Sequence, residues 1–337
     1  MSSEENLIER IGKFFPASAR SLRIGIGDDA AVLRHGQGEW VLTTDAFLEN
    51  VHFLRGAQPP HATGFKSLAR ATSDLAAMGA TPRFFLLSLA LPATCTGKWL
   101  DDFLAGMAMA ARRFGLILVG GDTTKYPSIL VNLTVLGEIE PGLAILRSGA
   151  RPGDALCISG RLGEAELGLQ LILKELHKQR RYKGLLRKQS YPEPRLALGR
   201  WLATRKRATA MIDTSDGLST DLAHLCKASN VGARVLADLI PTAAVPNDLR
   251  GLGLDPLALA LNGGEDYELI FTVSKRFVGR LPRAVGGVPI TIIGQITRNK
   301  KIVLVSGTGQ AKTLSPEGWD PFRKLPGRTR EVKLPRK

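Results

Sequence analysis

Strand-like and helix-like segments alternate along the first half of this 337-residue chain. The strand-like runs are apolar, rich in β-branched or aromatic residues, and bounded by turn formers. They cover residues 41–44, 84–90, 116–119 and 129–137. Residues 62–78 and 98–114 instead carry apolar side chains at spacings of three and four and stop at Gly79 and Gly115, which favours helices. This alternation predicts an α/β fold.

The second half repeats this alternation after a connection rich in turn formers, residues 141–154. Strands are expected at 155–159, 209–213, 269–273, 290–294 and 302–305, and helices at 164–176 and 218–229. A chain of this length suits two domains. We therefore predict an amino-terminal domain over 1–147, a carboxy-terminal α/β domain over 148–325 and a basic tail over 326–337.

Composition excludes several classes of protein. With 44% apolar and 23% charged residues the chain is neither disordered nor fibrous. Its longest uncharged apolar stretch, 84–97, contains Pro92 and is shorter than the roughly 20 residues of a membrane span. The acidic amino terminus does not look like a signal peptide, so a cytoplasmic protein is expected. Cys95, Cys157 and Cys226 lack metal-site spacing and are predicted to be buried thiols.

The net charge of +15 invites a test for nucleic-acid binding. Residues 174–188 hold seven basic residues and one acid, and residues 323–337 repeat that balance, which leaves +3 for the rest of the chain. Neither segment interleaves the aromatic side chains on which bases stack. We expect a solvated loop, with Lys178 to Lys188 as an exposed extension, and a solvated tail, and no nucleic-acid partner.

Acidic residues gather in short loops, flanked by Gly, Ser or Thr, that come directly after apolar strands. One such loop alone is a turn or a helix cap. Six in one chain indicate more, because clustered carboxylates repel one another unless cations hold them, and hard oxygen ligands suit Mg²⁺. Several Mg²⁺ ions without a His or Cys cluster point to phosphate chemistry and to ATP. The six loops are Gly25–Asp29, Thr43–Asp45, Ser73–Asp74, Gly120–Asp122, Asp213–Asp216 and Gly263–Asp266.

Common nucleotide-binding motifs do not account for these loops. No P-loop motif and no protein-kinase motif set is present. Gly25, Gly27 and Ala30 fit a dinucleotide fingerprint, but Asp28 and Asp29 stand where that motif offers bare N–H groups to pyrophosphate. The residues that follow read as a hairpin rather than a helix. A Rossmann site is therefore disfavoured.

Some residues stay ambiguous on spacing alone. His52 and Lys66 are isolated, and such residues are more often surface or satisfied side chains than ligands. Asp213, Ser215 and Asp216 precede the predicted helix 218–229, so one of them is expected to cap it while the others face outward.

Seven segments stand out along the chain: IGIGDDAAVL (24–33), TTDAFLENVHF (43–53), SDLAAMGATP (73–82), GGDTTK (120–125), RSGARPGD (147–154), DTSDGLSTDL (213–222) and GGEDYEL (263–269). Together, and in this order, they resemble the thiamine-monophosphate kinase family, a branch of the aminoimidazole ribonucleotide synthetase-like superfamily. The early reactive cysteine of the selenophosphate branch is missing.

The resemblance implies ATP- and Mg²⁺-dependent phosphorylation of thiamine monophosphate to thiamine diphosphate, by direct in-line transfer. It also implies a homodimer in which the amino-terminal sheets join into a barrel, while a carboxy-terminal α/β sandwich closes each site. No covalent or general-base residue is expected, because the attacking phosphate oxygen is already ionised. The basic stretch and the tail are expected to touch none of the matching loops.

The resemblance also assigns residues. It implies ATP contacts at Gly121, Asp122, Arg147 and Ser215, and thiamine-phosphate contacts at His52, Glu265 and Trp319. Asp28 is expected to act through water. The implied Mg²⁺ ligands are Asp29, Thr43, Thr44, Asp45, Asp74, Asp122, Asp213 and Asp216.

Two alternatives remain at this point. One is a basic scaffold or nucleic-acid-binding protein on an inactive kinase fold, which predicts broken metal loops; none is broken. The other is a superfamily relative that acts on a different small phosphate or carboxylate.

Overall fold

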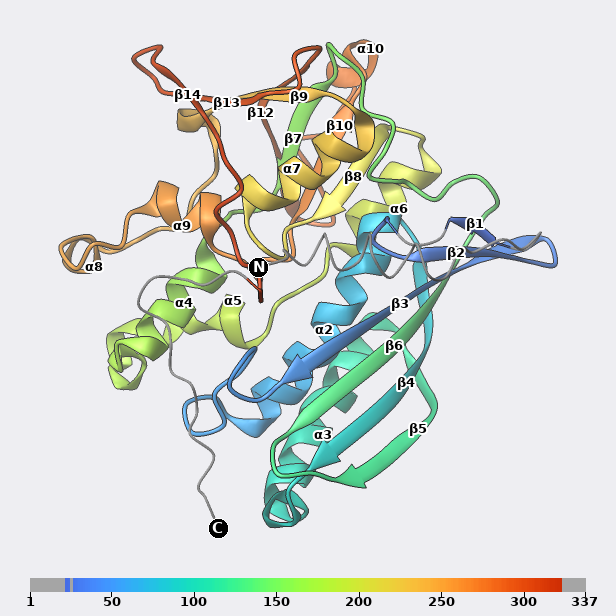
Figure 1. The fold of residues 1–337 in the computed structure, drawn as a ribbon, viewed down its shortest axis with the longest axis vertical. Helices are drawn as coiled ribbons and strands as arrows, with labels where there is room; N and C mark the ends of the chain where they lie inside the picture. The colour runs from blue at the N-terminus through green and yellow to red at the C-terminus, as the bar shows by residue number, and fades with distance from the viewer. Residues whose placement is uncertain (1–21, 25–26, 323–337) are drawn as a thin grey trace.

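The computed structural model describes residues 22–24 and 27–322, and it places two sheets on either side of a long central helix (Figure 1). Helices α2 (Pro60–Met78) and α3 (Lys98–Phe114) pack together against one face of the amino-terminal sheet. In sheet order, its strands are β1 (Leu22–Ile24), β2 (Ala31–His35), β3 (Gly38–Leu48), β6 (Leu130–Ile139), β4 (Thr81–Leu91) and β5 (Ile117–Lys125).

Side chains alternate across the central strand of this sheet, as the period of two requires. Val131, Leu133 and Val135 of β6 are buried beneath the helices. Asn132 and Thr134 point to the other face, which no helix of the described residues covers. The amino-terminal domain thus has one face in the core and one open face.

The carboxy-terminal domain is built on a mixed sheet in which β9, β12, β7, β10 and β8 pair antiparallel in that order, whereas β13 pairs in parallel with β9. Helix α7 (Leu218–Ser229) packs against β8. Its strands are β7 (Ala155–Ser159), β8 (Ala208–Asp213), β9 (Gly232–Leu236), β10 (Leu269–Val273), β11 (Ala284–Val285), β12 (Val288–Thr297), β13 (Ile302–Val305) and β14 (Ala311–Thr313). Its other helices are α4 (Glu164–Leu173), α5 (Arg187–Ser190), α6 (Leu196–Thr204), α8 (Asn247–Arg250), α9 (Pro256–Asn262) and α10 (Lys275–Val278).

Helix α2 joins the two domains. It packs on α6 and on β8, and the hydrophobic core that contains Leu75 also contains Met211 and Phe271 of the second sheet. At Gly199 of α6 an added Cβ would lie 2.0 Å from the carbonyl oxygen of Ala76, so only a glycine lets the two helices approach this closely. The domains therefore share a core.

The mixed α/β class with two sheets is confirmed. The three cysteines are buried and unpaired, also as predicted. The boundary at residue 147 stays a prediction; β6 ends at Ile139 and β7 begins at Ala155. The tail 326–337 lies outside the described residues. No helix in the described part of the chain has both the length and the apolar character of a membrane span.

Four predicted segments were wrong. Three of the six predicted acidic loops lie inside regular elements: Gly120–Asp122 continue β5, which runs to Lys125 and pairs in parallel with β4, Thr43–Asp45 lie within β3, and Ser73–Asp74 lie within α2. The helix expected at 164–176 ends at Leu173, and 3₁₀ turns at 176–178 and 180–186 follow it.

Candidate active site

Three acidic side chains from both domains converge where α2 meets β8. Asp29 precedes β2, Asp74 lies on α2, and Asp213 ends β8. Each offers a carboxylate oxygen, and these oxygens all lie within 4.8 Å of one another. Three segments that are far apart in the sequence thus form one acidic cluster between the domains.

Neighbouring side chains orient this acidic cluster. The Thr43 hydroxyl donates to Asp74 over 2.6 Å, and the Ser73 hydroxyl donates to Asp213. Burial, followed by the charges of nearby aspartates, raises the pKa of Asp74 well above its usual value. Burial and the charge of Asp29 raise the pKa of Asp213 to about 7. In the absence of a cation these carboxylates therefore hold protons tightly.

Arg147 closes one side of the acidic cluster. Its guanidinium Nε donates to Asp29 Oδ1 over 3.0 Å, and its backbone N–H donates to Asp28. Asp28 contacts the cluster through this backbone group, and burial together with the charge of Asp29 raises its pKa to about 6. Arg147 is thus the cation that the protein itself supplies on this side.

The acidic cluster fits a hard divalent cation. Asp29 Oδ2 is fully buried and has no hydrogen-bond partner in the described structure. A buried carboxylate oxygen without a partner is costly. The ligands on offer are carboxylate oxygens, with the Thr43 hydroxyl beside them, which is the donor set that Mg²⁺ prefers.

Strand β3 divides the predicted ligands Thr43, Thr44 and Asp45 between two faces of the sheet. Thr43 and Asp45 share the face that α2 covers, where Asp45 accepts a hydrogen bond from Arg70 Nε over 3.1 Å. Thr44 points the other way and meets Asn132 and Thr134 of β6. The side chain of Thr44 is therefore not brought to the acidic cluster.

Asp122 and Gly121 lie on β5, at the far edge of the same sheet. Asp122 pairs with Ser88, Ser88 with Asn132, and Asn132 with Ala46 of β3. Three steps of about 4.8 Å separate β5 from β3 in this register. Within one copy of the chain, these two residues are not gathered with Asp29, Asp74 and Asp213.

The loop before α7 carries Ser215 and Asp216 next to Asp213. The Ser215 hydroxyl donates to Asp216 over 3.3 Å. The expectation that Asp213, Ser215 or Asp216 caps this helix was wrong, because Gly217 holds the cap position without a side-chain bond. Asp221, one turn inside the helix, accepts the N–H groups of Asp216 and Gly217 instead.

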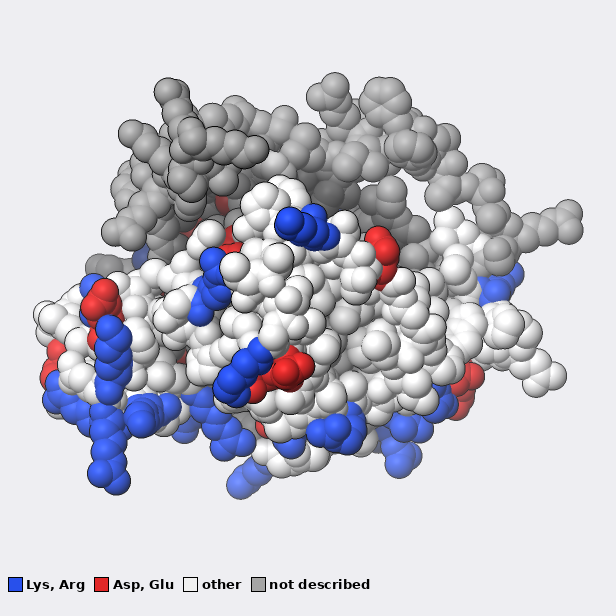
Figure 2. Space-filling view, turned by 90° about the horizontal axis from the view of Figure 1, so that it is seen from below, with Lys and Arg blue, Asp and Glu red and all other residues white. Residues whose placement is uncertain are grey.

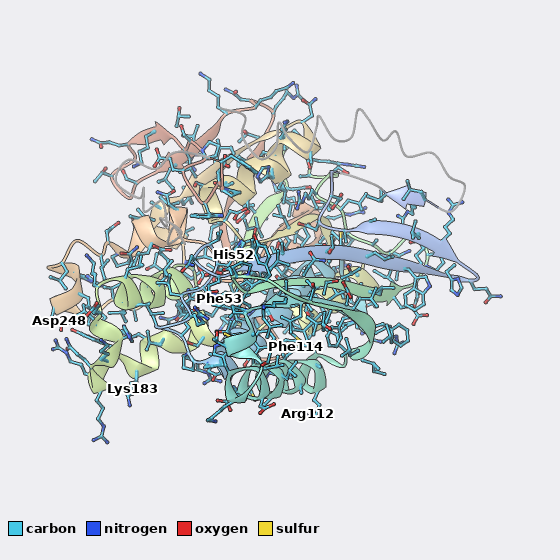
Figure 3. All side chains as sticks on the ribbon, turned by 60° about the horizontal axis from the view of Figure 1, so that its bottom comes forward. His52, Phe53, Arg112, Phe114, Lys183 and Asp248 are labelled. Carbon is cyan, nitrogen blue, oxygen red and sulfur yellow. The ribbon has the colours of Figure 1, made fainter. Side chains whose placement is uncertain are left out.

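His52 is one of the residues that the resemblance assigns to the thiamine-phosphate contacts. In Figure 3 it sits near the middle of the molecule. Its Nδ1 accepts the backbone N–H of Leu48, and its ring stacks on Phe47. Burial, with the charge of Arg70, lowers the pKa of His52 to about 4. His52 is therefore uncharged at neutral pH and offers Nε2 as a hydrogen-bonding group.

Glu265 pairs with a buried lysine across the domain interface. Lys66 Nζ of α2 donates to Glu265 Oε2 over 2.6 Å, and Gln189 contacts both residues. Although burial alone would raise the pKa of Glu265, the Lys66 ammonium lowers it. Both of these contacts use Oε2, so Oε1 has no hydrogen-bond partner among the described residues and remains for a ligand.

Trp319 lies beside the loop before α7. Its backbone N–H donates to the Asp216 carbonyl oxygen over 3.0 Å, and Gly318 donates to the Thr220 hydroxyl. The indole is half-buried. The chain segment at Trp319 is thus fixed next to Asp216.

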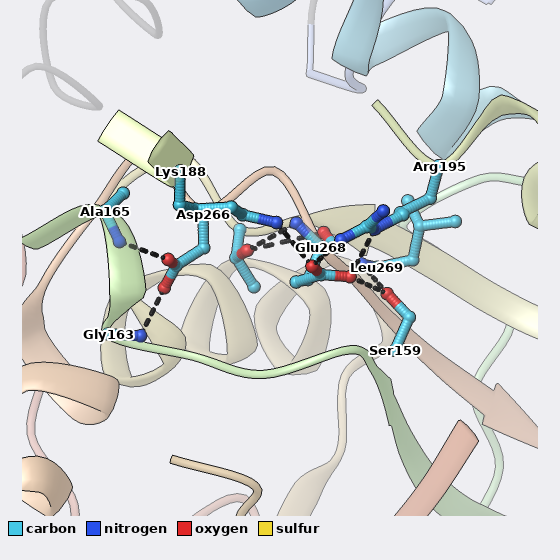
Figure 4. A network of polar contacts seen from close by, with 9 residues as sticks. Ser159, Gly163, Ala165, Lys188, Arg195, Asp266, Glu268 and Leu269 are labelled. Carbon is cyan, nitrogen blue, oxygen red and sulfur yellow. Dashed lines mark hydrogen bonds and ion pairs between the residues drawn. The ribbon is translucent and has the colours of Figure 1, made fainter. Parts of the chain in front are cut away.

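The loop that carries Glu265 is held by a second buried network (Figure 4). Glu268 accepts hydrogen bonds from Lys188, Arg195 and Ser159, and Asp266 accepts the N–H groups of Gly163 and Ala165 at the start of α4. The prediction that the basic stretch is exposed and touches no matching loop was wrong for Lys188. Its side chain is 12% exposed and donates to Glu268, which belongs to the matching segment 263–269.

The predicted exposure of the basic stretch holds for Lys178 and Arg181. Arg181 pairs with Asp248. Lys183 stands at the edge of the molecule in Figure 3. Figure 2 shows Lys and Arg side chains spread over one face, several of them next to acids and separated by uncharged surface. This pattern does not resemble a continuous nucleic-acid-binding stripe.

Sequence reasoning missed Arg70 and left Lys66 ambiguous. Both precede Asp74 on α2, at intervals of four residues, so the three side chains share one face of the helix. Counting back from Asp74 by four and eight residues would have found both. Their charged partners Asp45 and Glu265 come from other segments, which spacing cannot reveal.

Comparison with known proteins places this chain in a family. The AIR synthase related protein N-terminal domain matches residues 27–139, and the C-terminal domain of the same description matches residues 151–307. Thiamine-monophosphate kinase from Bacillus subtilis is 36% identical over 312 residues, which cover 90% of this chain and 94% of that protein. The Escherichia coli K12 enzyme is also 36% identical, and the match covers 95% and 98%. The chain belongs to the thiamine-monophosphate kinase family.

Solved structures agree with this membership. AaThiL complexed with AMPPCP and TMP superposes with a TM-score of 0.83 at 32% identity, covering 95% of this chain and 97% of that one. The hydrogenase maturation protein HypE in complex with ATP, at 24% identity and a TM-score of 0.68, shares the fold. The resemblance to the thiamine-monophosphate kinase family and the two-domain fold predicted from it are thereby confirmed; the dimer barrel stays a prediction.

Proposed function

We propose that this protein transfers the γ-phosphoryl group of ATP to the phosphate of thiamine monophosphate, with Mg²⁺, and forms thiamine diphosphate and ADP. The observation that carries the proposal is the acidic cluster of Asp29, Asp74 and Asp213 between the domains. Relatives that are 36% identical bear the name of this activity, and a solved relative was complexed with AMPPCP and TMP.

Asp29, Asp74 and Asp213 would hold Mg²⁺, with Thr43 orienting Asp74 and Ser73 orienting Asp213. When bound there, the metal supplies positive charge that neutralises phosphate oxygens. The remaining predicted ligands Thr44, Asp45, Asp122 and Asp216 belong to the proposal only by resemblance.

On the ATP side, Arg147 supplies a fixed positive charge. Its guanidinium is already oriented by Asp29, and this pairing raises its pKa despite burial, so it stays charged. A charged, pre-positioned guanidinium suits phosphate oxygens. We assign Arg147 and Ser215, with Gly121 and Asp122 from β5, to the ATP contacts.

On the acceptor side, Glu265 and His52 would hold the thiamine moiety. Lys66 and Gln189 fix the Glu265 carboxylate, whose Oε1 can meet the positive thiazolium ring. His52 is neutral, and because its Nδ1 accepts the Leu48 N–H, its Nε2 carries the proton and can donate. Trp319, beside Asp216, offers an indole face for stacking.

The reaction needs no general base. An ionised oxygen of the thiamine phosphate attacks the γ-phosphorus, the bond from that phosphorus to the β–γ bridging oxygen breaks, and ADP leaves with the electron pair. Catalysis then consists of alignment and of charge neutralisation.

The proposal includes a homodimer formed through the open face of the amino-terminal sheet. Leu118 and Val119 of the edge strand β5 are 51% and 56% exposed, and Leu86 of β4 is 40% exposed. An unpaired apolar edge strand is a surface that soluble proteins normally cover. A second copy of the chain would cover it.

Product analysis tests the proposed activity. Purified protein is incubated with ATP, Mg²⁺ and thiamine monophosphate, and nucleotides and thiamine species are separated by chromatography. Thiamine diphosphate is expected only when the metal and the monophosphate are both present, and free thiamine should give no product. ADP formation without thiamine diphosphate would instead point to another phosphate or carboxylate acceptor, and absence of turnover despite Mg²⁺-dependent ATP binding would contradict the proposal.

A further inference from the structure

Two anions must meet in the proposed reaction, so the acceptor side needs positive charge of its own. Three basic side chains interact there: His52, Lys66 and Arg70. His52 is neutral, because burial lowers its pKa to about 4. Lys66 is fully buried, and its charge is matched by Glu265 at 2.6 Å. Of these three, only Arg70 is both a cation and partly exposed, at 24% against 2% for the Lys66 side chain.

Arg70 lies between the acidic cluster and the acceptor residues. It precedes Asp74 by four residues on α2, which is about 6 Å along the helix axis. It follows Lys66, the partner of Glu265, by the same interval. The charges of Asp45 and Glu265 raise its pKa although burial alone would lower it, so the side chain remains a cation.

The guanidinium of Arg70 has a free end. Its Nε donates to Asp45 Oδ2 over 3.1 Å, whereas no hydrogen-bond partner for its Nη atoms occurs among residues 22–24 and 27–322. The side chain is 24% exposed, so the free end can be reached by a ligand. Two Nη groups in a plane match two oxygens of a phosphate.

We propose that Arg70 binds the phosphate of thiamine monophosphate through its Nη atoms and holds it toward the acidic cluster. This inference rests on the proposed function. Asp45 fixes the guanidinium through Nε, so little side-chain freedom is lost on binding. Arg70 would then discriminate the monophosphate from unphosphorylated thiamine.

A different role would be electrostatic only. Arg70 could simply neutralise Asp45, which is a predicted Mg²⁺ ligand. In that case removal of the guanidinium would tighten Mg²⁺ binding and leave the affinity for thiamine monophosphate unchanged. The two roles thus give different results for the same variant.

The test compares Arg70→Gln with Arg70→Lys and with a matched control, Arg83→Gln. Arg83 also donates through Nε to a carboxylate, that of Glu138 at 3.0 Å, but it lies on the exposed start of β4. Steady-state KM values for ATP and for thiamine monophosphate are measured at saturating Mg²⁺. Calorimetry then gives the Kd of thiamine monophosphate and of thiamine, and thermal melting checks the fold.

For Arg70→Gln we expect the KM and the Kd of thiamine monophosphate to rise roughly 10- to 100-fold, as for loss of a charge-assisted hydrogen bond. The Kd of thiamine and the KM of ATP should change less than about threefold, and Arg70→Lys should lie between wild type and Arg70→Gln. Arg83→Gln should behave as wild type.

Unchanged thiamine-monophosphate affinity in a folded Arg70→Gln protein would overturn the inference, as would equal weakening for thiamine and its monophosphate. If Arg70→Gln does not fold, the affinities of Arg70→Lys for thiamine monophosphate and for thiamine are compared instead, and the same two outcomes would overturn the inference. Failure of the wild-type protein to form thiamine diphosphate would reject the proposed function itself, which the product analysis detects separately.

Discussion

Lys66 and Glu265 form a charge pair inside the protein that ties α2 to the loop 263–268. Glu265 has a positive φ of 67°, and Tyr267 one of 49°, so this loop is held in a conformation that side chains seldom adopt. The ammonium of Lys66 stabilises it from the opposite side of the interface, and the amide of Gln189 stabilises it from within the second domain. One lysine thereby couples domain packing to a predicted substrate contact.

Replacing Lys66 by Met should destabilise the protein strongly, because it leaves the Glu265 carboxylate unpaired in the interface. We expect the free energy of unfolding to fall by about 3–5 kcal/mol, measured by urea denaturation. Lys98→Met serves as the control, since the Lys98 side chain is 87% exposed. Adding Glu265→Gln to Lys66→Met should restore part of the loss; a decrease below about 1 kcal/mol for Lys66→Met alone would contradict this role.

The acidic cluster predicts a pH-dependent effect of Mg²⁺. Asp213 has a pKa of about 7 against 3.8 ordinarily, so the metal-free folded state binds a proton more tightly than the unfolded state and loses stability as pH rises from 3.8 to 7. Mg²⁺ requires the deprotonated form and competes with that proton. The rise in melting temperature on adding Mg²⁺ should therefore grow from about pH 6 to about pH 8.

Thermal melting with and without MgCl₂ at these pH values measures this effect. Asp213→Asn removes the titrating group and should flatten the pH dependence. An equal Mg²⁺-induced shift at both pH values in the wild-type protein would argue against competition between the metal and a proton at Asp213.

Helix α2 is the element that organises the site. Its 19 residues carry Lys66, Arg70, Ser73 and Asp74, which face the acceptor residues and the acidic cluster. The same helix packs against α6 and β8 of the second domain. Any change in how α2 meets α6 should therefore alter the distance between Asp74 and Asp213.

Gly199→Ala tests this dependence. The added Cβ would lie 2.0 Å from the carbonyl oxygen of Ala76, so α6 must move away from α2. We expect a loss of about 1–3 kcal/mol in unfolding free energy and a larger KM for Mg²⁺. Gly184→Ala is the matched control, because its Cβ would meet nothing within 4 Å. If the two variants have the same free energy of unfolding and the same KM for Mg²⁺, the contact between α2 and α6 does not determine the geometry of the acidic cluster.

Among the described residues, no helix covers the outer face of the amino-terminal sheet. Thr44 points to this open face, and Asp122, in register with Ser88 and Asn132, lies at its edge on β5. Dimerisation through this face would therefore bury predicted ligands as well as apolar surface. The quaternary state is consequently part of the function proposed for these residues.

Leu118→Lys should weaken the proposed dimer, because it places a charge on the exposed edge strand β5. Sedimentation velocity at micromolar concentration is expected to show a dimer for the wild-type protein and a shift toward monomer for the variant. Leu252→Lys is the control, since Leu252 is 53% exposed but lies in the other domain, against 51% for Leu118. A wild-type monomer would reject the dimer.

The alternation of apolar runs, and glycines such as Gly79 that end helices, allowed the sequence by itself to predict most elements and both sheets. The motifs predicted the family, and the resemblance to that family named Asp29, Asp74 and Asp213 among eight implied ligands. The tertiary structure brings these three together. Local patterns failed at two other places. Gly120–Asp122 belong to β5 because β4 pairs with them, and the N–H of Asp216 before α7 is bonded by Asp221, a residue inside that helix.

Only the tertiary structure decided which charges meet. Lys66 opposite Glu265, Arg70 opposite Asp45 and Lys188 opposite Glu268 are pairs between segments distant in the chain. Their energies depend on distance and burial, which are properties of packing rather than of local sequence. The sequence therefore determined which chemical groups are present, and the packing of α2 between two sheets decided which of them act together.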